Sequence, residues 1–529
     1  MKKLSILPFL LLTLASINSA ATSIEVSGPV SGTWDADTVL VMGDLLVPDG
    51  QTLTIAPGSR IICWSHFRIN IQGRILAEGN SGDTILFTVR DTANFHNPST
   101  ERGGWFGIRF NQTPAQNDTS RFSFCRFEFG KAFGDSVDEY GGAIYARYFG
   151  KIGITNCLFY HNNSYFSGGA VYLWNSDACL RNNIFKDNYA GNPGNIYGYG
   201  GGVCAMHSSP EITRNVFLRN SSTGVGGGVS FDDADPVFTN NIFENNYSAL
   251  GGALGVLRCS PASAFSNLLI VNNTSLFFGG GISCIRSFPV FSNLTITNNS
   301  SCYGGGIYCN DSAMPSFYNS IIHGNTGLGV SAYIWDIRSA PDFYYCDVEG
   351  DTAGFEGSGG HQGYHGEYRY NIDENPGFYG AGLFPYQLTG NSPCIDAGTP
   401  DATFLNIPAY DLGFAPRIWN NRIDMGAYEY NGTTGTAGNN ASSDEWFSVC
   451  PNPFSNSFRI DLKRNLNLKV NFRIKNLQGN VLQDICIPPG THHYMVDCIS
   501  SCTGMLPSGA YILEADNGKE KSVKIILKY

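Results

Sequence analysis

The pattern of apolar and polar positions repeats along the middle of the chain. After each of seven glycine pairs, apolar residues occupy alternate positions, and the position between them varies in polarity. The pairs begin at Gly141, Gly168, Gly200, Gly226, Gly251, Gly279 and Gly304. A period of two with a consistently apolar column predicts a short strand with one buried face. Short strands at a fixed period, separated by Gly, Asn, Ser and Pro, favour stacked β-structure over paired helices.

A second phrase accompanies the first, with Phe or Ile followed three positions later by Asn. The seven Asn residues are Asn162, Asn188, Asn220, Asn246, Asn273, Asn299 and Asn325. Four of the six intervals between them are 26 residues, and the others are 27 and 32. The long interval holds a six-residue insert at 191–196. Self-similarity at this period predicts a solenoid in which each repeat is one coil of a parallel β-helix.

Stacked coils explain why the same residue types recur. Equivalent residues in adjacent coils lie about 4.8 Å apart, the ordinary strand spacing. An Asn amide can bond to the amides above and below it, and Asn tolerates the left-handed turn conformation. Glycine supplies positive φ or a close backbone approach where a coil bends. We therefore interpret the seven Asn residues as a structural ladder with no catalytic role.

Repeated in register, the two phrases resemble the repeats of polymorphic outer-membrane proteins and, more broadly, of right-handed parallel β-helix surface proteins. Typical copies are Gly-Gly-Ala-Ile at 141–144 and Phe-x-x-Asn at 159–162. The resemblance covers roughly the middle two fifths of the chain. It implies an all-β fold, a right-handed single-stranded parallel β-helix, in an extracellular bacterial protein with adhesion as the commonest proposed role. We assign the repeat array to residues 111–331.

Composition agrees with an all-β protein that has many turns and few charges. Glycine provides 63 of the 529 residues, and only 15% of the chain is charged. The formal net charge of -11 lacks the basic footprint of nucleic-acid binding, so we expect no nucleic-acid partner. The 15 cysteines show no Cys-x-x-Cys spacing. Cys284 and Cys309 share one inward column, where stacked thiols or a disulfide would fit.

The N-terminal residues 1–21 have the organisation of a secretory signal peptide. Two lysines precede a mostly apolar run, and small residues stand near the expected cleavage site. That run is too short to span a membrane, and no later segment is a long uninterrupted apolar stretch. We therefore expect no integral membrane span after signal removal.

Residues 22–110 carry a different set of predicted strands before the repeats begin. Candidates at 53–55, 69–71 and 85–87 are separated by turn sequences rich in Pro and Gly. Their order resembles the opening coils of secreted β-helix proteins. Because an open first coil would leave unpaired strand groups, we assign a capping role to residues 23–41.

The pattern weakens after residue 331, and we expect terminal coils and a cap in residues 332–430. Phrases at 392–398 and 422–430 look like the closing segment of bacterial extracellular β-helix proteins. The acids in this region are Asp396, Asp411, Asp424 and Glu429. Such carboxylates can bind Ca²⁺, but we favour their tying turns of the cap through backbone amides.

The end of the chain differs from the repeats. Residues 431–446 are small and polar and predict a flexible linker. Residues 447–529 have the size and strand pattern of a small β-sandwich. Four phrases there occur in an order closely similar to the C-terminal sorting domain of the type IX secretion system. The motif residues are Pro451, Asn452, Pro453, Phe454, Gly479, Gly509 and Tyr511.

The sorting-domain resemblance implies a location and a partner. It implies handling by the type IX secretion machinery and delivery to the exterior or outer surface of a Gram-negative, Bacteroidetes-like bacterium. The domain is commonly removed in that family.

An enzyme built on a β-helix needs defined catalytic groups. A lyase needs a base near Ca²⁺ carboxylates, and a glycoside hydrolase needs two carboxylates a few ångströms apart. The best acidic cluster is Asp232, Asp233 and Asp235, at a turn between repeat strands. Neighbouring coils continue no acidic column at this turn, so we interpret it as solvated, with a Ca²⁺ site as the alternative. We assign no catalytic or cofactor-binding residue.

Histidine supplies no stronger candidate. His361 and His365 have the spacing of a helical metal pair, but the glycines from 357 to 366 disfavour a helix there. His207 has no Ser-Asp constellation near it in the sequence.

Aromatic residues give a better reason to expect binding. Tyr145, Tyr172 and Tyr308 occupy the position between the two apolar columns, and Trp174 lies two residues beyond Tyr172. If exposed, these rings would stack on sugars or protein partners. We favour the alternative that they pack beneath loops.

The sequence thus favours a secreted or cell-surface β-helix protein with a non-enzymatic role in adhesion or recognition, for which glycans or cell-surface proteins are the expected partners. The alternative is a polysaccharide-active enzyme, either a lyase or a glycoside hydrolase, on the same scaffold.

Overall fold

The computed structural model places most of the chain. It describes residues 22–97, 100–192, 194, 197–381, 384–420, 422–431, 447–450, 457–462, 469–475, 481–491, 493–497, 509–516 and 521–528. The expected signal peptide and nearly all of the expected linker lie outside these residues. Within them the regular structure is β, apart from three 3₁₀ turns, η1 (Ser136–Glu139), η2 (Asp351–Gly354) and η3 (His361–Gly363).

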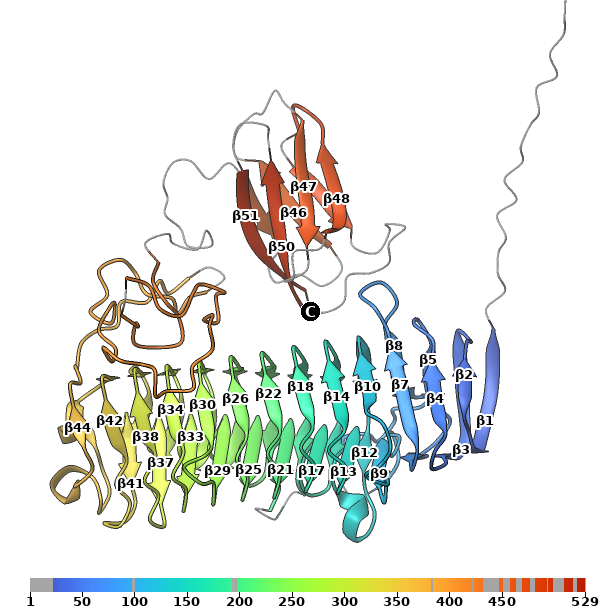
Figure 1. The fold of residues 1–529 in the computed structure, drawn as a ribbon, viewed down its shortest axis with the longest axis horizontal. Helices are drawn as coiled ribbons and strands as arrows, with labels where there is room; N and C mark the ends of the chain where they lie inside the picture. The colour runs from blue at the N-terminus through green and yellow to red at the C-terminus, as the bar shows by residue number, and fades with distance from the viewer. Residues whose placement is uncertain are drawn as a thin grey trace, which may run out of the picture.

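Four parallel stacks of short strands build the main domain. The coils from β9 (Ile108–Asn111) to β40 (Thr326–Leu328) contribute one strand to each stack, and the coils before and after them contribute none to the fourth. One coil consists of β13 (Ile144–Arg147), β14 (Ile152–Thr155), β15 (Leu158–Tyr160) and β16 (Asn163–Ser164). Figure 1 shows the coils succeeding one another along the long axis of this domain. Gly141 turns the chain into β13 at a φ of 65°, which a side chain would strain.

The remaining strands follow the same order in every coil. The first stack contains the second half of β3 (Thr38–Val47), β6 (Ile69–Ile71), β9 (Ile108–Asn111), β13, β17 (Val171–Trp174), β21 (Val203–Met206), β25 (Val229–Asp232), β29 (Leu254–Leu257), β33 (Ile282–Ile285), β37 (Ile307–Asn310) and β41 (Ala332–Ile334). The second contains β2 (Gly32–Trp34), β4 (Thr52–Ile55), β7 (Arg74–Glu78), β10 (Ser120–Ser123), β14, β18 (Cys179–Arg181), β22 (Glu211–Thr213), β26 (Val237–Thr239), β30 (Ala264–Ser266), β34 (Val290–Ser292), β38 (Ser316–Tyr318), β42 (Asp342–Tyr344) and β44 (Tyr368–Arg369).

The other two stacks complete the coil. The third contains β1 (Ser23–Pro29), β3 (Thr38–Val47), β5 (Arg60–Cys63), β8 (Ile85–Val89), β11 (Cys125–Glu128), β15, β19 (Ile184–Lys186), β23 (Val216–Leu218), β27 (Ile242–Glu244), β31 (Leu269–Val271), β35 (Thr295–Thr297), β39 (Ile321–Ile322) and β43 (Asp347–Val348). The fourth contains β12 (Lys131–Ala132), β16, β20 (Tyr189–Ala190), β24 (Ser221–Ser222), β28 (Tyr247–Leu250), β32 (Thr274–Phe278), β36 (Ser300–Tyr303) and β40 (Thr326–Leu328).

The core is a column of stacked rings and aliphatic side chains. Six phenylalanines follow one another coil by coil with ring centroids 4.7 to 4.9 Å apart. They are Phe87, Phe127, Phe159, Phe185, Phe217 and Phe243. Burying each such side chain contributes about 1.5 to 3 kcal/mol before entropy is subtracted. The apolar columns read from the sequence therefore form the continuous core of the solenoid.

The seven Asn residues of the repeated phrase stack within the turn before the fourth stack. The side-chain oxygen of Asn188 accepts hydrogen bonds from the backbone nitrogen and Nδ2 of Asn162, at 2.9 and 3.0 Å. Its Nδ2 donates to the Phe159 carbonyl at 3.0 Å and to Asn220 Oδ1 at 2.8 Å. The same pattern continues to Asn325. Each amide thereby satisfies buried backbone groups of the neighbouring coil.

A second amide column lies five residues earlier and has no counterpart in the sequence analysis. Asn183, Asn215 and Asn241 repeat the same hydrogen bonds, with side-chain contacts of 3.0 and 3.1 Å between neighbours. Cys157 precedes them and donates its backbone nitrogen to Asn183 at 2.9 Å. Asn371 ends the same column and accepts the backbone nitrogen of Cys346 at 2.8 Å. Because only four positions of the column carry Asn, and Leu, Ser and Cys separate Asn371 from the other three, its periodicity is weaker than that of the first ladder.

The first residues of the main domain form a coil of their own. Residues 23–41, expected to cap the helix, supply β1, β2 and the start of β3, which pair in parallel with strands of the coil that follows. Within the described residues β1 is the terminal strand and is mostly exposed.

At the opposite end, aromatic rings close the core. Phe355 is fully buried, and Tyr364 and Tyr368 pack against the same hydrophobic cluster. Their ring centroids lie 5.1 and 6.1 Å from that of Phe355. The coils therefore end at β44, well before residue 430.

Residues 376–430, here called the return segment, run back along the side of the coils. The cap expected within residues 332–430 thus has two parts, and this one covers a flank. Asn293 Nδ2 donates to the carbonyl of Asp424 at 3.1 Å, and the nitrogen of Gly426 donates to the Asn319 carbonyl at 2.8 Å. In Figure 1 its orange trace lies beside β30 and β34.

The flank suits this contact because its outward side chains are apolar at β31 and β39. Leu269 and Val271 of β31 pack against Leu412, Ala427 and Tyr428 of the return segment. An irregular segment without strands of its own is thereby held by apolar contacts and by Asn side chains.

The C-terminal domain contains two antiparallel sheets. One has β45 (Phe447–Cys450), β46 (Ser457–Leu462) and β49 (His493–Asp497), and the other has β48 (Val481–Ile487), β47 (Val470–Lys475), β50 (Gly509–Asp516) and β51 (Lys521–Lys528). Its core includes Phe447, Phe472 and Tyr511. The predicted fold class, a right-handed parallel β-helix followed by a small β-sandwich, is confirmed.

Candidate functional site

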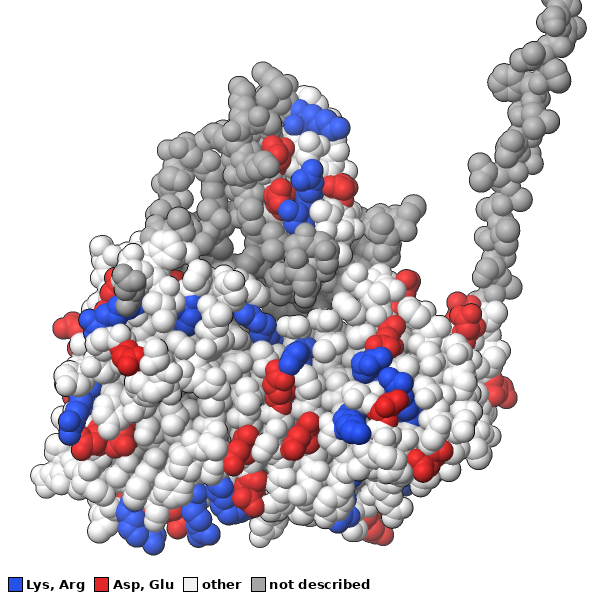
Figure 2. Space-filling model, in the orientation of Figure 1, with Lys and Arg blue, Asp and Glu red and all other residues white. Residues whose placement is uncertain are grey.

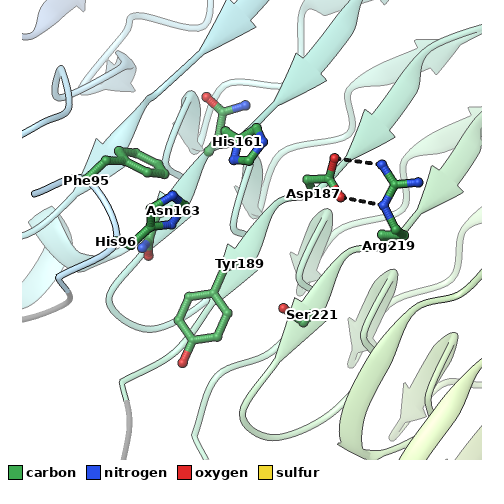
Figure 3. A pocket seen from close by; sticks show the side chains of 9 residues that line it. Phe95, His96, His161, Asn163, Asp187, Tyr189, Arg219 and Ser221 are labelled. Carbon is green, nitrogen blue, oxygen red and sulfur yellow. Dashed lines mark hydrogen bonds and ion pairs between the residues drawn. The ribbon is translucent and has the colours of Figure 1, made fainter. Parts of the chain in front are cut away.

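A hollow of about 330 Å³ opens on the outer surface of the fourth stack. Its lining consists of Phe95, His96, His161, Asn162, Asn163, Asp187, Tyr189, Arg219 and Ser221. Figure 3 shows these side chains coming from three successive coils and from an overhanging loop. The hollow therefore depends on stacking of the coils.

Strand register brings the lining residues together. Asn163 pairs with Tyr189, and Tyr189 with Ser221, in the parallel strands β16, β20 and β24. The overhanging loop is held by Lys131, whose ammonium group donates to the carbonyls of Asn97 at 2.8 Å and Arg102 at 3.0 Å. One buried cation thus fixes the loop that carries Phe95 and His96.

Two charges in the lining bind one another. Arg219 donates from Nε and Nη2 to the two oxygens of Asp187 at 2.8 and 2.9 Å. Burial lowers the pKa of the His161 imidazole, and the nearby Asp187 carboxylate offsets part of that fall. His161 stacks on Phe129 with ring centroids 5.8 Å apart. Among the described residues of the lining, Asp187 is the single carboxylate, whereas glycoside hydrolysis uses two.

A second hollow of about 560 Å³ continues the first along the helix axis. The two share Tyr189 and Ser221. The second is lined further by Gly194, Ser222, Thr223, Tyr247, Ala249, Leu276 and Phe277. The joined hollows therefore cross successive coils.

Exposed apolar side chains extend this surface toward the C-terminal coils. Their exposed fractions lie between 37% and 49% for Tyr247, Leu276, Phe277, Tyr303, Leu328 and Trp335. Phe278 links them, with ring centroids 5.2 Å from Tyr303 and 5.4 Å from Trp335. We call the outer surface of the fourth stack together with Trp335 the axial face. Exposed apolar groups gathered in this way mark interaction surfaces.

The three carboxylates considered for Ca²⁺ do not converge. Asp232 forms an ion pair with Arg258, and Asp233 accepts from His207 Nδ1 at 2.7 Å. Asp235 accepts from the Ser260 and Ser263 hydroxyls at 2.7 and 2.8 Å. Burial raises the pKa of Asp232, while the bonds to Asp235 outweigh burial and lower its pKa. Among the described residues, no three His, Cys, Asp or Glu side chains form a cluster able to hold a metal ion.

The aromatic column singled out in the sequence is buried. Tyr145 and Tyr172 are at most 3% exposed, because the glycine turns fold over them. A Cβ on Gly168 would lie 2.8 Å from that of Tyr172. Trp174 is partly exposed and contacts the ring of His207, 5.0 Å away. Their alternative role beneath loops is therefore the one observed.

The remaining histidine and cysteine candidates share no metal-holding cluster within the described residues. His207 does have an acidic partner, Asp233, one coil later in sequence. His361 opens the 3₁₀ turn η3, and His365 follows that turn. The buried thiols of Cys284 and Cys309 form no disulfide and occupy paired positions in β33 and β37.

The acids of the return segment tie turns. Asp424 accepts the backbone nitrogens of Asp396 and Tyr430, both at 2.6 Å. Glu429 accepts the nitrogen of Trp419 at 2.9 Å, and Asp411 accepts that of Glu429 at 2.8 Å. The carboxylates of Asp411, Asp424 and Glu429 therefore accept hydrogen bonds from backbone amides.

The sorting-motif residues are only partly described. Pro451 to Phe454 and Gly479 lie outside the described residues. Gly509 begins β50, and Tyr511 is buried in the core of its domain.

Three segments match known protein families. Residues 115–286 match a right-handed β-helix region, and residues 293–310 match a Chlamydia polymorphic membrane protein repeat. Residues 448–528 match a secretion system C-terminal sorting domain. No curated protein matches the chain. In the described part of the chain, no helix has the length and apolarity needed to cross a membrane.

Proposed function

We propose that this secreted β-helix protein, delivered by its C-terminal sorting domain, acts in adhesion or recognition and binds its partner along the axial face. Its role is non-enzymatic. The mature chain acts outside the outer membrane after export by type IX machinery, with its signal peptide removed.

One observation carries the proposal, namely the line of half-exposed apolar side chains from consecutive coils beside two joined hollows. Rigid stacking fixes their spacing without the entropy cost of ordering loops on binding. On the face drawn in Figure 2, acidic and basic side chains are interspersed, so the charges visible there form no docking patch of one sign.

The rival function, polysaccharide cleavage, gains no support from the geometry. In the part of the lining that the structure describes there is one carboxylate, Asp187, and it is bonded to Arg219. Asp232, Asp233 and Asp235 each bind a different side chain, namely Arg258, His207 and Ser260, so the three carboxylates do not act on a common point.

The test is attachment of native cells whose chromosomal copy carries Tyr247→Ala and Phe277→Ala. We expect attachment to fall to the level of a deletion strain, with equal amounts of protein at the surface. Tyr148→Ala is the matched control, because Tyr148 is 60% exposed at the turn after β13. Release of reducing ends from a polysaccharide, lost in Asp232→Ala and Asp233→Ala, would contradict the proposal.

A further inference from the structure

From β16 to β40 the axial face carries one uncharged hydrogen-bonding side chain per coil in a straight row. Before it, Lys131 of β12 pairs with Asn163, and its buried ammonium group is bonded to carbonyls of the overhanging loop. Members occupy paired positions of adjacent parallel strands, about 4.8 Å apart. The row is Asn163, Tyr189, Ser221, Tyr247, Thr274, Ser300 and Thr326. The hydroxyls of Thr274 and Ser300 approach to 3.1 Å. The row therefore offers a ligand a ladder of donors and acceptors parallel to the helix axis.

The backbone beneath this row is already used by neighbouring coils. The nitrogens of Tyr189, Ser221 and Tyr247 each donate to a carbonyl of the preceding coil at 2.9 Å. Strand addition by a peptide needs a free edge of main-chain groups. Recognition at the row must therefore use side chains.

Charge along the row also narrows the ligand. Asp187 and Arg219 bind one another beside it, and the row itself is uncharged. The whole chain carries a formal charge of -11, which disfavours approach of an anionic polymer. An uncharged ligand meets neither obstacle.

Aromatic rings alternate with the hydroxyls. Tyr189 and Tyr247 flank Ser221, and both line the second hollow. A sugar ring has an apolar C–H face and a rim of hydroxyl groups, so it matches a tyrosine ring beside a serine. Successive sugar units of one chain would then meet successive coils.

From this geometry we infer that the axial face binds a linear, uncharged polysaccharide that runs parallel to the helix axis. Sugar rings stack on Tyr189 and Tyr247, and the hydroxyl row bonds to their rims. This inference rests on the proposed recognition function and adds the class of ligand.

The experiment is native electrophoresis of the mature full chain in gels that contain a soluble polysaccharide. The neutral probes are hydroxyethylcellulose, a linear β-1,3-glucan and a linear mannan, and the anionic probe is polygalacturonate. We expect retardation by at least one neutral probe. Tyr189→Ala and Tyr247→Ala should each weaken it about tenfold, the loss of one buried ring face. Tyr247→Phe should keep most of the retardation, and Tyr148→Ala should keep all of it.

Melting temperatures of the variants distinguish lost binding from lost folding. A variant that binds weakly but melts at the wild-type temperature has lost binding alone. Tyr247→Phe and Tyr247→Ala allow this comparison at one position. The inference is overturned if no neutral probe retards the wild-type chain, or if polygalacturonate retards it more strongly. If native-cell attachment still depends on Tyr247 in that case, the recognition function stands and its ligand is of another class. If attachment is also unaffected, both proposals fall.

Discussion

The repeat array and the return segment solve the same problem in different ways. In the array, a buried turn receives its hydrogen bonds from the Asn side chain of the next coil. In the return segment, the carboxylates of Asp424 and Glu429 serve that purpose. An amide carries no charge, so it can be buried repeatedly, whereas each buried carboxylate needs compensation. The comparison teaches that a periodic sequence allows neutral side chains to do what an irregular segment does with charges.

The largest expected effect comes from removing the buried cation of the return segment. Arg417 is 2% exposed, donates to the carbonyls of Asp424 and Gly426, and lies 3.5 Å from Glu429. Arg417→Met leaves the Glu429 side chain and the buried carbonyls of Asp424 and Gly426 without this partner, so docking of the segment should weaken by about 3 to 5 kcal/mol. Hydrogen exchange of peptides from 405–430 measures it.

In the same experiment, peptides from the coils should exchange as in the wild-type chain. Arg286→Met is the matched control, because Arg286 pairs with Asp311 at an exposed site. Its cost should stay below about 1 kcal/mol. Equal acceleration in coil and return-segment peptides would mean that the two regions unfold as one unit.

The next effect concerns the array. In Asn246→Leu, the backbone nitrogen of Asn220 and the carbonyl of Phe217 lose their partner. We expect the free energy of unfolding to fall by about 1 to 3 kcal/mol, measured by chemical denaturation of the mature chain. Glu244→Gln, on the strand just before, should leave it unchanged. An unchanged melting curve for Asn246→Leu would refute a stabilising ladder.

A rise in pH should loosen the return segment more than the array, where Asp232 also has a raised pKa. Burial raises the pKa of Glu429 to about 8 and that of Asp424 to about 6. Both values exceed those of the unfolded chain, so the stabilisation is complete below about pH 4 and declines as pH rises through 8. The ratio of hydrogen exchange in the two regions, measured from pH 5 to pH 9, reports it. A ratio independent of pH would contradict the buried-carboxylate account.

The smallest effect is chemical and leaves stability untouched. Cys302 is exposed, whereas Cys284 and Cys309 are buried. Burial raises the pKa of the Cys284 thiol, and alkylation requires the thiolate. A brief treatment with iodoacetamide should therefore modify Cys302 and spare the buried pair, as mass spectrometry would reveal. In Arg417→Met, Cys394 of the return segment should become reactive before Cys284 does.

Much of the solenoid was predictable because its physics is periodic. The Asn162 ladder and the apolar columns recur once per coil, so the sequence displays them directly. The Asn183 column shares the period but carries Asn in few coils, which hides it among ordinary turn residues. A structural feature of a solenoid is thus easier to recognise in the sequence when more coils carry it.

The candidate site was less predictable, because the exposure of each outward column of side chains depends on which turns and loops pack over it. Tyr172 alternates with buried residues and was a candidate for exposure, yet the Gly168 turn lies over it. Tyr189 and Tyr247 were not singled out, since they follow the ladder at a position whose exposure depends on the insert and on the Lys131 loop. His207 and Asp233 meet across one coil, a distance of 26 residues that no local motif spans.

The amide ladder also has a direction. The side chain of Asn162 serves the nitrogen of Gly130 and the carbonyl of Phe127, both in the coil before it. Every turn is therefore finished by the coil that follows it in the chain. Cutting coils from the C-terminal side would strand a donor and an acceptor at the new end, while cutting from the N-terminal side would leave each remaining turn complete. The order of the coils in the chain is therefore also the order in which the buried turns gain their hydrogen bonds, since each turn needs the Asn of the following coil.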